Sequence, residues 1–567
     1  MKISNFLSNF FFYSEEENYN FDLYDTPQVN IMENENDHPV SEVKNIFSDV
    51  KSNLEYLKIQ YNTLINSDIV IRKFRLVANN TTYQAFIFYI DGMVNSDTIN
   101  DFILSPLMLR NRSNTHRIKS EALKDSQIVS SILAQSTPKH NFDLETYIYE
   151  SLLPQNSLKK VKEFKPLISD INSGNCALFV ETLNTAFDIE VKGFKSRSIG
   201  QPSNEIVVRG SQEAFVEVIR TNTSLIRRMI HNENLVIENI NVGNVSQTST
   251  AICYMKNIAN DNLVSEVKYR INNLNVDYLF SSGQLEQLIQ DNGNISVPQI
   301  ISTERPDRVA NNLLCGRVAV LVDGSPYALV MPGILVDYLS SPEDSNLKHQ
   351  FSNLLKVVRL ISFFFALLLP AIYIAITNYH QELIPTELVF AIVASREAVP
   401  FPIIFEIFLM EISFELIREA GVRIPSVLGP TIGIVGALIL GQAAVSASIV
   451  SPILIIIVAI TGICSFAIPD FSLSFSIRLY RFIYILLACF AGLLGIGLGL
   501  FVQCAIITSL KSFGVNYLAS SLEMNSSKNN NTYWVHPIWK RENRADYLKT
   551  KKPRIEKNIS MKWKKLK

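Results

Sequence analysis

The chain has 567 residues, of which 47% are hydrophobic and 19% charged, with a formal net charge of −1 and a mean hydropathy of +0.15. This length exceeds one ordinary globular domain, so at least two folding units are expected. These averages resemble those of a soluble protein, but they conceal three regions that exclude a uniformly soluble one: a polar part to about Lys356, a hydrophobic block over 357–510, and a tail over 511–567 with 14 Lys or Arg against four Asp or Glu.

The polar part begins with residues 1–65, which are rich in Asn, Asp, Glu and Ser. We expect this stretch to be mostly disordered, with a helix around 41–62. The first residues lack a small-residue cleavage site, and three Glu residues at 15–17 follow a short aromatic run. They are therefore not expected to form a signal peptide, and the polar domain that follows is expected in the cytoplasm.

From Asp68 onward, segments typical of strands alternate with segments typical of helices. Apolar runs bounded by turn residues predict strands over 69–77, 84–90, 176–181, 186–193, 235–242 and 251–256, and a hairpin over 317–332 that turns at Asp323-Gly324. Helical spacing and capping residues predict helices over 95–109, 211–230, 265–274, 283–290 and 304–316, with Ser211 as the cap of the second.

This alternation predicts a soluble α/β (α+β) N-terminal region of two subdomains, over 66–150 and 151–345, without an internal repeat. A polytopic α-helical membrane domain is expected over 346–515, and a basic tail of cytoplasmic type over 516–567. The positive charge of the tail has two interpretations: contact with an anionic partner such as lipid head groups, or simple solvation.

The hydrophobic block contains several stretches long enough for a membrane helix, which needs about 20 apolar residues to cross roughly 30 Å. They lie at 357–376, 432–450, 452–468 and 482–510, and the last can tilt or break at its glycines. With the less apolar 401–418 segment, this gives four to six hydrophobic helices in a multi-pass membrane protein.

Basic residues bear on the topology because cytoplasmic loops carry an excess of Lys and Arg. Lys348, Lys356 and Arg359 precede the block, and the basic tail follows it, so an even number of crossings is expected. Two further inside loops are indicated by Arg418 with Arg423 and by Arg478 with Arg481. Counting 401–418 as a span gives five crossings unless 482–510 breaks.

The segment 395–425 places several carboxylates among Phe, Ile and Leu. On a helix, Glu411, Glu415 and Glu419 form one stripe, with Arg418 at its border and Glu406 turned away. A charge at mid-bilayer depth costs about 2.5–3.5 kcal/mol, so these groups are expected to avoid lipid.

Three interpretations of the stripe compete. It lines a water-filled cation pathway or gate; it is a structural pin neutralised by Arg396, Arg418 or Arg423; or the helix lies flat in the membrane interface. We favour a pathway or a subunit interface for the stripe as a whole, because the segment has more carboxylates than nearby cations.

Prolines and small residues surround the stripe. Pro370, Pro400 and Pro402 are predicted helix breaks or kinks. Gly429 and Gly433 form a G-x-x-x-G pair, and Gly441 continues a pattern of small residues that lets helices pack closely. These features together indicate a tightly packed, oligomeric bundle.

Motifs of known catalytic chemistry are missing from the sequence. It has no Walker A loop, G-x-S-x-G elbow, H-E-x-x-H pair or G-x-G-x-x-G turn. Its six cysteines contain no C-x-x-C pair, and no His lies at metal-ligand spacing, so no disulfide framework, catalytic residue, metal or cofactor is expected. The sequence therefore does not predict an enzyme.

Several long segments resemble the A subunits of bacterial spore germinant receptors, the GerA family. The match includes ERPDRVANNLLCGRVAVLVDGSPYALVMP, GNCALFVE, KSFGVNYLAS and nearly all of the stretch from SREAVPFPIIFEIF at 395 to SFAIPD at 470. It extends over roughly 68–520. The tail beyond 520 and the polar start of the chain depart from the family pattern.

This resemblance implies a subunit in the inner membrane of the dormant spore that acts with B and C subunits to sense nutrients. It further implies self-association into a ring in the membrane lipid that forms a nutrient-gated cation channel, with no nucleic-acid partner. Three alternatives stay open: an accessory A-like protein that amplifies germination, a secondary transporter, which predicts inverted repeats, and a membrane-anchored enzyme.

Overall fold

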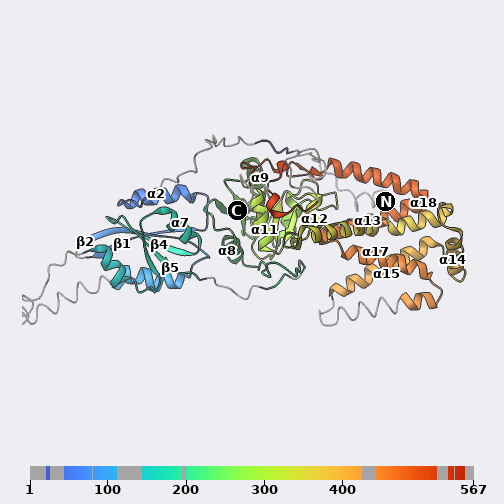
Figure 1. Cartoon of the computed structure of the whole chain (residues 1–567), viewed down its shortest axis with the longest axis horizontal. Helices are drawn as coiled ribbons and strands as arrows, with labels where there is room; N and C mark the ends of the chain where they lie inside the picture. The colour runs from blue at the N-terminus through green and yellow to red at the C-terminus, as the bar shows by residue number, and fades with distance from the viewer. Residues whose placement is uncertain are drawn as a thin grey trace, which may run out of the picture.

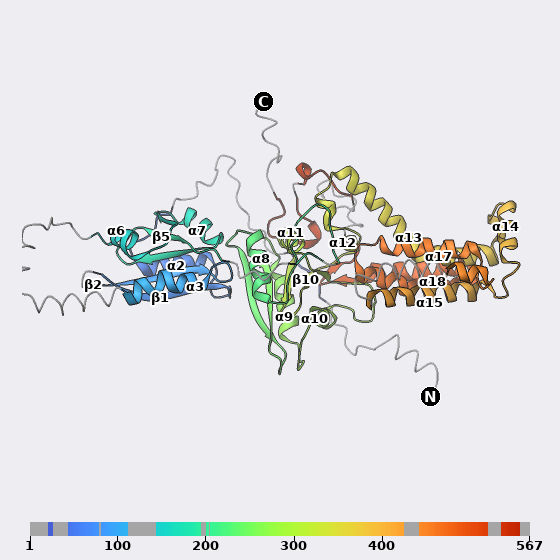
Figure 2. The ribbon, with the colours of Figure 1, turned by 90° about the horizontal axis from the view of Figure 1, so that it is seen from below.

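The structure, a computed structural model, describes residues 21–25, 44–78, 81–110, 143–193, 200–202, 204–423, 441–519, 534–541 and 543–555. Its described part is elongated, with two sheet-containing units and a helical bundle in succession along the long axis (Figure 1, Figure 2). An α/β N-terminal region followed by an α-helical region agrees with the fold class predicted from the sequence.

The first unit is built on a five-stranded antiparallel sheet of order β1-β2-β4-β5-β3. Its strands are β1 Ile69–Ala78, β2 Thr81–Ile90, β3 Leu158–Val161, β4 Asn175–Val180 and β5 Ala186–Glu190. The predicted β1–β2 pair is confirmed, with Phe74 opposite Ala85. Nearly every side chain of β4 and β5 is buried because both faces of the sheet are covered.

Helices cover both faces of this sheet. One face packs against α2 Val50–Gln60 and α7 Phe164–Asn172, and the other against α3 Ser96–Ile99, α6 Leu144–Tyr147 and the π-helical turns next to them. Asp49 caps α2 through its side chain, and Leu54 and Leu57 of this helix are buried in the core.

Two expected boundaries differ from the structure. Residues 44–65 of the polar segment are part of the first unit, because the apolar side of α2 covers its sheet, whereas Leu23 of the described stretch 21–25 lies in the core of the second unit. The expected division at 150 falls inside this unit, since β3, β4 and β5 pair with β1 and β2 in one sheet.

The second unit contains another five-stranded antiparallel sheet, of order β6-β7-β9-β10-β8. Its strands are β6 Leu235–Val242, β7 Thr248–Met255, β8 Ile301–Thr303, β9 Val318–Val322 and β10 Ala328–Met331, and the predicted β9–β10 hairpin is confirmed. Its helices are α8 Ile219–Met229, α9 Asp261–Asn272, α10 Ser282–Ile289 and α11 Pro306–Cys315. The helix predicted to start at Ser211 begins only at Ile219, because residues 211–218 form an irregular segment held by the Asn222 side chain.

The two units repeat one topology, contrary to the expectation of no internal repeat. In both, the strand order by position in the unit is first, second, fourth, fifth, third. Both units also begin with a helix, which is α2 in the first unit and α8 in the second. In both, another helix lies directly before the fourth strand: α7 in the first unit and α11 in the second. A buried ion pair joins the two units. Arg227 Nε of α8 lies 2.8 Å from Oδ2 of Asp68, and Asp68 is the residue directly before β1.

The helical region follows with α13 His349–Tyr379, α14 Thr386–Arg396, α15 Ile403–Arg423, α17 Pro452–Phe466 and α18 Phe471–Ser509. By length and apolar composition, α13 and α18 could cross a membrane, while α17 is shorter, with 15 residues. Pro370 lies inside α13, which continues through it, so the expected break is not found there. Pro400 and Pro402 lie between α14 and α15. Residues 432–440 of the candidate span 432–450 lie outside the described residues.

α18 is two antiparallel arms and not one straight helix. Gly492 has φ 57° and ψ −136°, which only glycine adopts readily, and it breaks the helix, which was one of the two alternatives left open for the 482–510 stretch. The Tyr484 hydroxyl donates a hydrogen bond to the Gln503 side chain across the two arms. The turn at Gly492 packs against Tyr379 at the end of α13.

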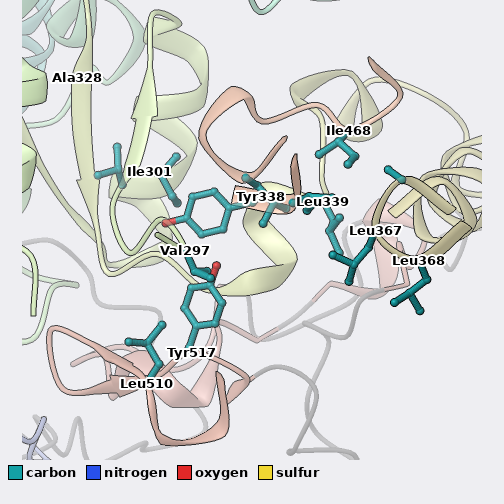
Figure 3. Packing of buried hydrophobic residues seen from close by; sticks show 14 of the residues in the cluster. Val297, Ile301, Ala328, Tyr338, Leu339, Leu367, Leu368, Ile468, Leu510 and Tyr517 are labelled. Carbon is teal, nitrogen blue, oxygen red and sulfur yellow. The ribbon is translucent and has the colours of Figure 1, made fainter. Parts of the chain in front are cut away.

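The bundle and the second unit share one continuous core (Figure 3). At this junction Tyr338 stacks on Tyr517 with ring centroids 6.1 Å apart, near Leu339, Leu367 and Ile468. After α18 the chain returns to the second unit through the short hairpin β11 Lys511–Ser512 and β12 Val515–Asn516. The chain therefore enters and leaves the bundle at the same end.

The described part of the tail packs on the second unit. The Tyr547 hydroxyl lies 3.2 Å from Nη2 of the buried Arg317, and Trp539 lies edge-on to His349 at the start of α13. Lys551 donates its backbone N–H to the Ile258 carbonyl. Residues 534–541 and 543–555 thus contact protein as well as solvent, which neither interpretation of the basic tail anticipated.

Candidate functional site

The carboxylates of α15 lie at contacts between helices of the bundle. Glu406, near the start of α15, is 1% exposed. Its Oε1 accepts a hydrogen bond from Nη2 of Arg396 on α14 at 3.2 Å, and its Oε2 accepts one from the backbone N–H of Ser451 at 3.0 Å. Ser451 is in turn the N-cap of α17. One buried carboxylate therefore joins α14, α15 and the start of α17.

A larger charged cluster lies further along α15, where it faces the first arm of α18. Arg478 Nη1 donates to Glu415 Oε2 at 2.8 Å, and Arg481 Nη2 donates to Glu415 Oε1 at 3.3 Å. Arg481 Nη1 also lies 3.3 Å from Glu411 Oε2, and both of these residues are fully buried. We call Glu411, Glu415, Arg418, Arg478 and Arg481 the charged cluster.

Arg418 connects the charged cluster to α17. Its Nη2 donates to the Ser465 hydroxyl at 2.5 Å, and its Nη1 lies 3.8 Å from Glu415. The guanidinium also lies over the rings of Phe414 and Phe466, at 5.2 and 4.5 Å from their centroids. Such contacts favour a cation that has been removed from water.

The charged cluster is incompletely hydrogen-bonded. Among the described residues, neither carboxylate oxygen of Glu411 has a hydrogen-bond partner, and the same holds for Nε and Nη1 of Arg481. Buried charges in this state are costly, because Coulomb attraction alone rarely offsets their desolvation. The cluster therefore carries buried charge whose desolvation its own contacts offset only in part.

The structure places the predicted site residues as follows. Arg396 contacts Glu406, Arg418 contacts Glu415, and Glu419 is exposed on the last turns of α15. Gly441 lies beside Ile455, which a Cβ added at this glycine would meet at van der Waals distance. The Arg423 side chain and residues Gly429 and Gly433 lie outside what the structure describes.

For two arginines of the charged cluster, the sequence predicted a position in a loop. Arg478 and Arg481 were interpreted as markers of an inside loop, but both lie on α18, 8% and 0% exposed. Their three-residue spacing, which puts them on one face of a helix that continues into the apolar 482–510 stretch, was the available signal. With them, Glu411 and Glu415 face three guanidinium groups, so the argument from an excess of carboxylates does not hold.

The soluble units provide little support for catalysis. Burial raises the pKa of the Cys253 thiol to about 12 and raises that of Cys176 further, so both stay protonated and unreactive near neutral pH. In the described segments, no three His, Cys, Asp or Glu side chains are grouped closely enough to hold a metal ion.

Comparison with known proteins identifies relatives of the whole chain. The family model for the Bacillus/Clostridium GerA spore germination protein matches residues 55–547. The chain is 37% identical over 481 residues to spore germination protein KA of Bacillus subtilis, covering 85% of this chain and 84% of that protein. It is also 37% identical over 493 residues to the uncharacterized membrane protein YfkQ of the same organism, covering 86% and 88%.

One solved structure is also similar: the crystal structure of the N-terminal domain of the A subunit of the Bacillus megaterium spore germinant receptor GerK3. It is 31% identical, with a TM-score of 0.35, and the alignment covers 51% of this chain and 96% of that one.

Proposed function

Because the chain belongs to the GerA family of spore germination proteins, we propose that it is the A subunit of a nutrient germinant receptor in the inner membrane of the dormant spore. The observation that carries this proposal is the extent of the family match, residues 55–547, which includes most of both soluble units, the bundle and the described tail as far as residue 547. A match of this extent favours a shared role for the whole chain over a borrowed domain.

The proposal includes a multi-pass arrangement with the soluble units in the cytoplasm. Two observations support it: the chain enters and leaves the bundle at one end, which requires an even number of crossings, and basic residues gather at that end. Arg359 lies there, on the third turn of α13, and pairs with Asp344 of the soluble region at 2.6 Å. α18 would then contribute two crossings, one for each arm.

We further propose that the bundle self-associates into a ring that conducts cations, and that B and C subunits supply nutrient recognition. The incompletely bonded charged cluster supports this, because α15 carries ionisable groups into the interior of an otherwise apolar bundle. Lipid would contact the many exposed apolar residues of α13, α17 and α18, such as Phe364, Ile463 and Phe490.

Deletion of the gene tests the receptor role. Spores without it should lose the response to at least one nutrient in a panel of amino acids, sugars and salts, together with the early release of cations, and a reintroduced copy should restore both. An unchanged response and cation release across the panel would contradict the proposal.

A second candidate, an accessory A-like protein that amplifies germination, is favoured by one observation. The chain is as similar to YfkQ, an uncharacterized membrane protein, as to spore germination protein KA. Slower germination on every nutrient, without selective loss of any, would support this candidate. A neighbouring gene for a ten-span transporter-like B subunit would favour the receptor.

A further inference from the structure

A cavity of about 450 Å³ lies where the first unit, the second unit and the tail meet. Its wall includes the C-terminal end of α2 and the following turn, the residue before β6, the turn after β7, and the tail. Its polar lining consists of amides and amines, namely Gln60, Asn62, Asn234, Lys256, Asn257, Lys551 and Lys552. This size is within the range of small-molecule sites.

The charge of this lining favours an anion. In the described part of the chain, neither Lys256 nor Lys552 has a carboxylate within ion-pair distance, whereas Lys551 is held by Asp261 at 2.6 Å. Lys256 donates a hydrogen bond to the Asn62 side chain, so it already links the two units across the cavity. Two ammonium groups without acidic partners would contact a carboxylate with charge-assisted hydrogen bonds.

The lining also offers an acceptor. The side-chain oxygen of Asn257 is buried and has no hydrogen-bond partner among the described residues. A buried acceptor in this state is costly, and a donor on a ligand would relieve the cost. The required ligand therefore combines anionic groups with a donor such as a hydroxyl.

We propose that this cavity binds a small hydroxycarboxylate. Lys256 and Lys552 contact the carboxylates, and Asn257 accepts the hydroxyl. The ligand bridges the two soluble units and the tail, and the tail contacts the start of α13 through Trp539 and through the Val535 carbonyl, which accepts from Asn353. Occupancy of the cavity thus stabilises one arrangement of these parts next to the bundle. This inference does not depend on the germinant-receptor role.

The test is calorimetric titration of the purified full-length chain in detergent with citrate and with tricarballylate, which differ only by the citrate hydroxyl. We expect saturable binding of both, tighter for citrate. Lys256→Ala and Lys552→Ala should each weaken both ligands about tenfold, and Asn257→Ala should reduce the affinity for citrate to that for tricarballylate without changing the latter. Lys58→Ala, an exposed lysine of α2 outside the cavity, is the matched control and should change neither.

Three results would overturn the proposal. They are no saturable binding of either anion, a loss of affinity in the Lys58→Ala control equal to that in the cavity variants, or unchanged affinity in all three cavity variants. Hydrogen exchange gives a second readout that does not depend on the affinity of the variants. Citrate should slow exchange of the backbone amides at 60–62 and 549–552, and unchanged exchange in both segments would place the anion elsewhere.

Discussion

The Glu411–Arg481 contact is an ion pair that is fully buried between α15 and α18. Both side chains are fully buried, yet their 3.3 Å contact brings no hydrogen bond to Glu411. Removing one member leaves the other charge buried without its partner, whereas removing both charges leaves two neutral amides. The two residues should therefore be energetically coupled.

A double-mutant cycle measures this coupling. Glu411→Gln and Arg481→Gln should each destabilise the protein by up to about 3–5 kcal/mol, and the double variant should recover part of the combined loss. Thermal unfolding of the purified protein in detergent gives the comparison, with the exposed Glu419→Gln as a control of small effect. Strictly additive losses would show that the contact holds no coupling energy.

Glu286 on α10 should make stability depend on pH. Burial, followed by the nearby charge of Asp470, raises the pKa of its carboxyl to about 7 from an ordinary 4.5. Between about pH 4.5 and pH 7 the folded chain thus keeps a proton that the unfolded chain has released, so the free energy of unfolding should fall as pH rises through this window.

Glu286→Gln removes this titration, because the amide is neutral throughout. The variant should unfold at a higher temperature than the natural chain at pH 8 and at nearly the same temperature at pH 5. Thermal scans at both pH values check this, with exposed Glu55→Gln as the control. A shift of equal size at pH 5 and pH 8 would refute the assignment.

The charged residues also show what the sequence could predict. Spacing alone puts Glu411 and Glu415 on one helical face, and the apolar neighbours make lipid exposure too costly. The partners of these residues lie more than 60 positions away on α18, and no local pattern specifies which distant helix packs against α15. Arg478 and Arg481 directly precede the long apolar stretch 482–510. The sequence therefore predicts loop positions for both, and only the tertiary contact with α15 shows otherwise.

At the scale of elements, the strand order that the two units share was not predicted from the sequence. The individual strands and the β1–β2 and β9–β10 hairpins were predictable from alternation and turn residues, which act locally. The order in a sheet depends on non-local pairing, and β3 and β8 are short edge strands of four and three residues with little periodicity. Without those two strands, the shared topology cannot be recognised.

The hairpin of α18 permits a direct test by cross-linking. Tyr484 and Gln503 contact each other across the two arms, but in a straight helix they would be roughly 28 Å apart at 1.5 Å per residue. In a background without native cysteines, Tyr484→Cys with Gln503→Cys should be joined readily by a short bifunctional thiol cross-linker, which spans the gap left by the two long side chains that now meet at their tips.

The matched control replaces Tyr484 with its neighbour: Ile483→Cys with Gln503→Cys should cross-link poorly, because the Ile483 side chain is 43% exposed, whereas that of Tyr484 is buried and contacts the second arm. Equal cross-linking of the two pairs, or none in either, would contradict the two-armed structure and the even number of crossings that depends on it.

At the scale of the whole molecule, the tail stabilises the second unit. Buried Arg317 is bonded by Asp337 at 2.7 Å and by the Tyr547 hydroxyl at 3.2 Å. Tyr547→Phe should cost about 1 kcal/mol, and a chain that ends at residue 533 should lose more, because the apolar contacts of the tail are lost too. Thermal unfolding of the two variants beside the natural chain checks the ranking. Equal stability of the natural and shortened chains would show that the docked tail contributes nothing.

The predicted order of a soluble region followed by a helical region was correct because hydropathy separates these parts along the chain. The docking of the tail was not predictable, since residues such as Trp539 and Tyr547 are sparse among Lys and Asn, and their partners lie in distant elements. The same applies to the junction at Tyr338 and Tyr517, which unites segments from two regions in one core.

The central claim is that the charged cluster of α15 and α18 takes part in cation passage during germination. The most direct measurement is the rate of potassium release after nutrient addition from spores that carry Glu411→Gln or Glu415→Gln, with the amount of membrane-bound protein checked by immunoblot. The account predicts normal protein levels with slower release in both variants. Normal release from both would contradict it, and would leave the cluster as a structural pin between helices.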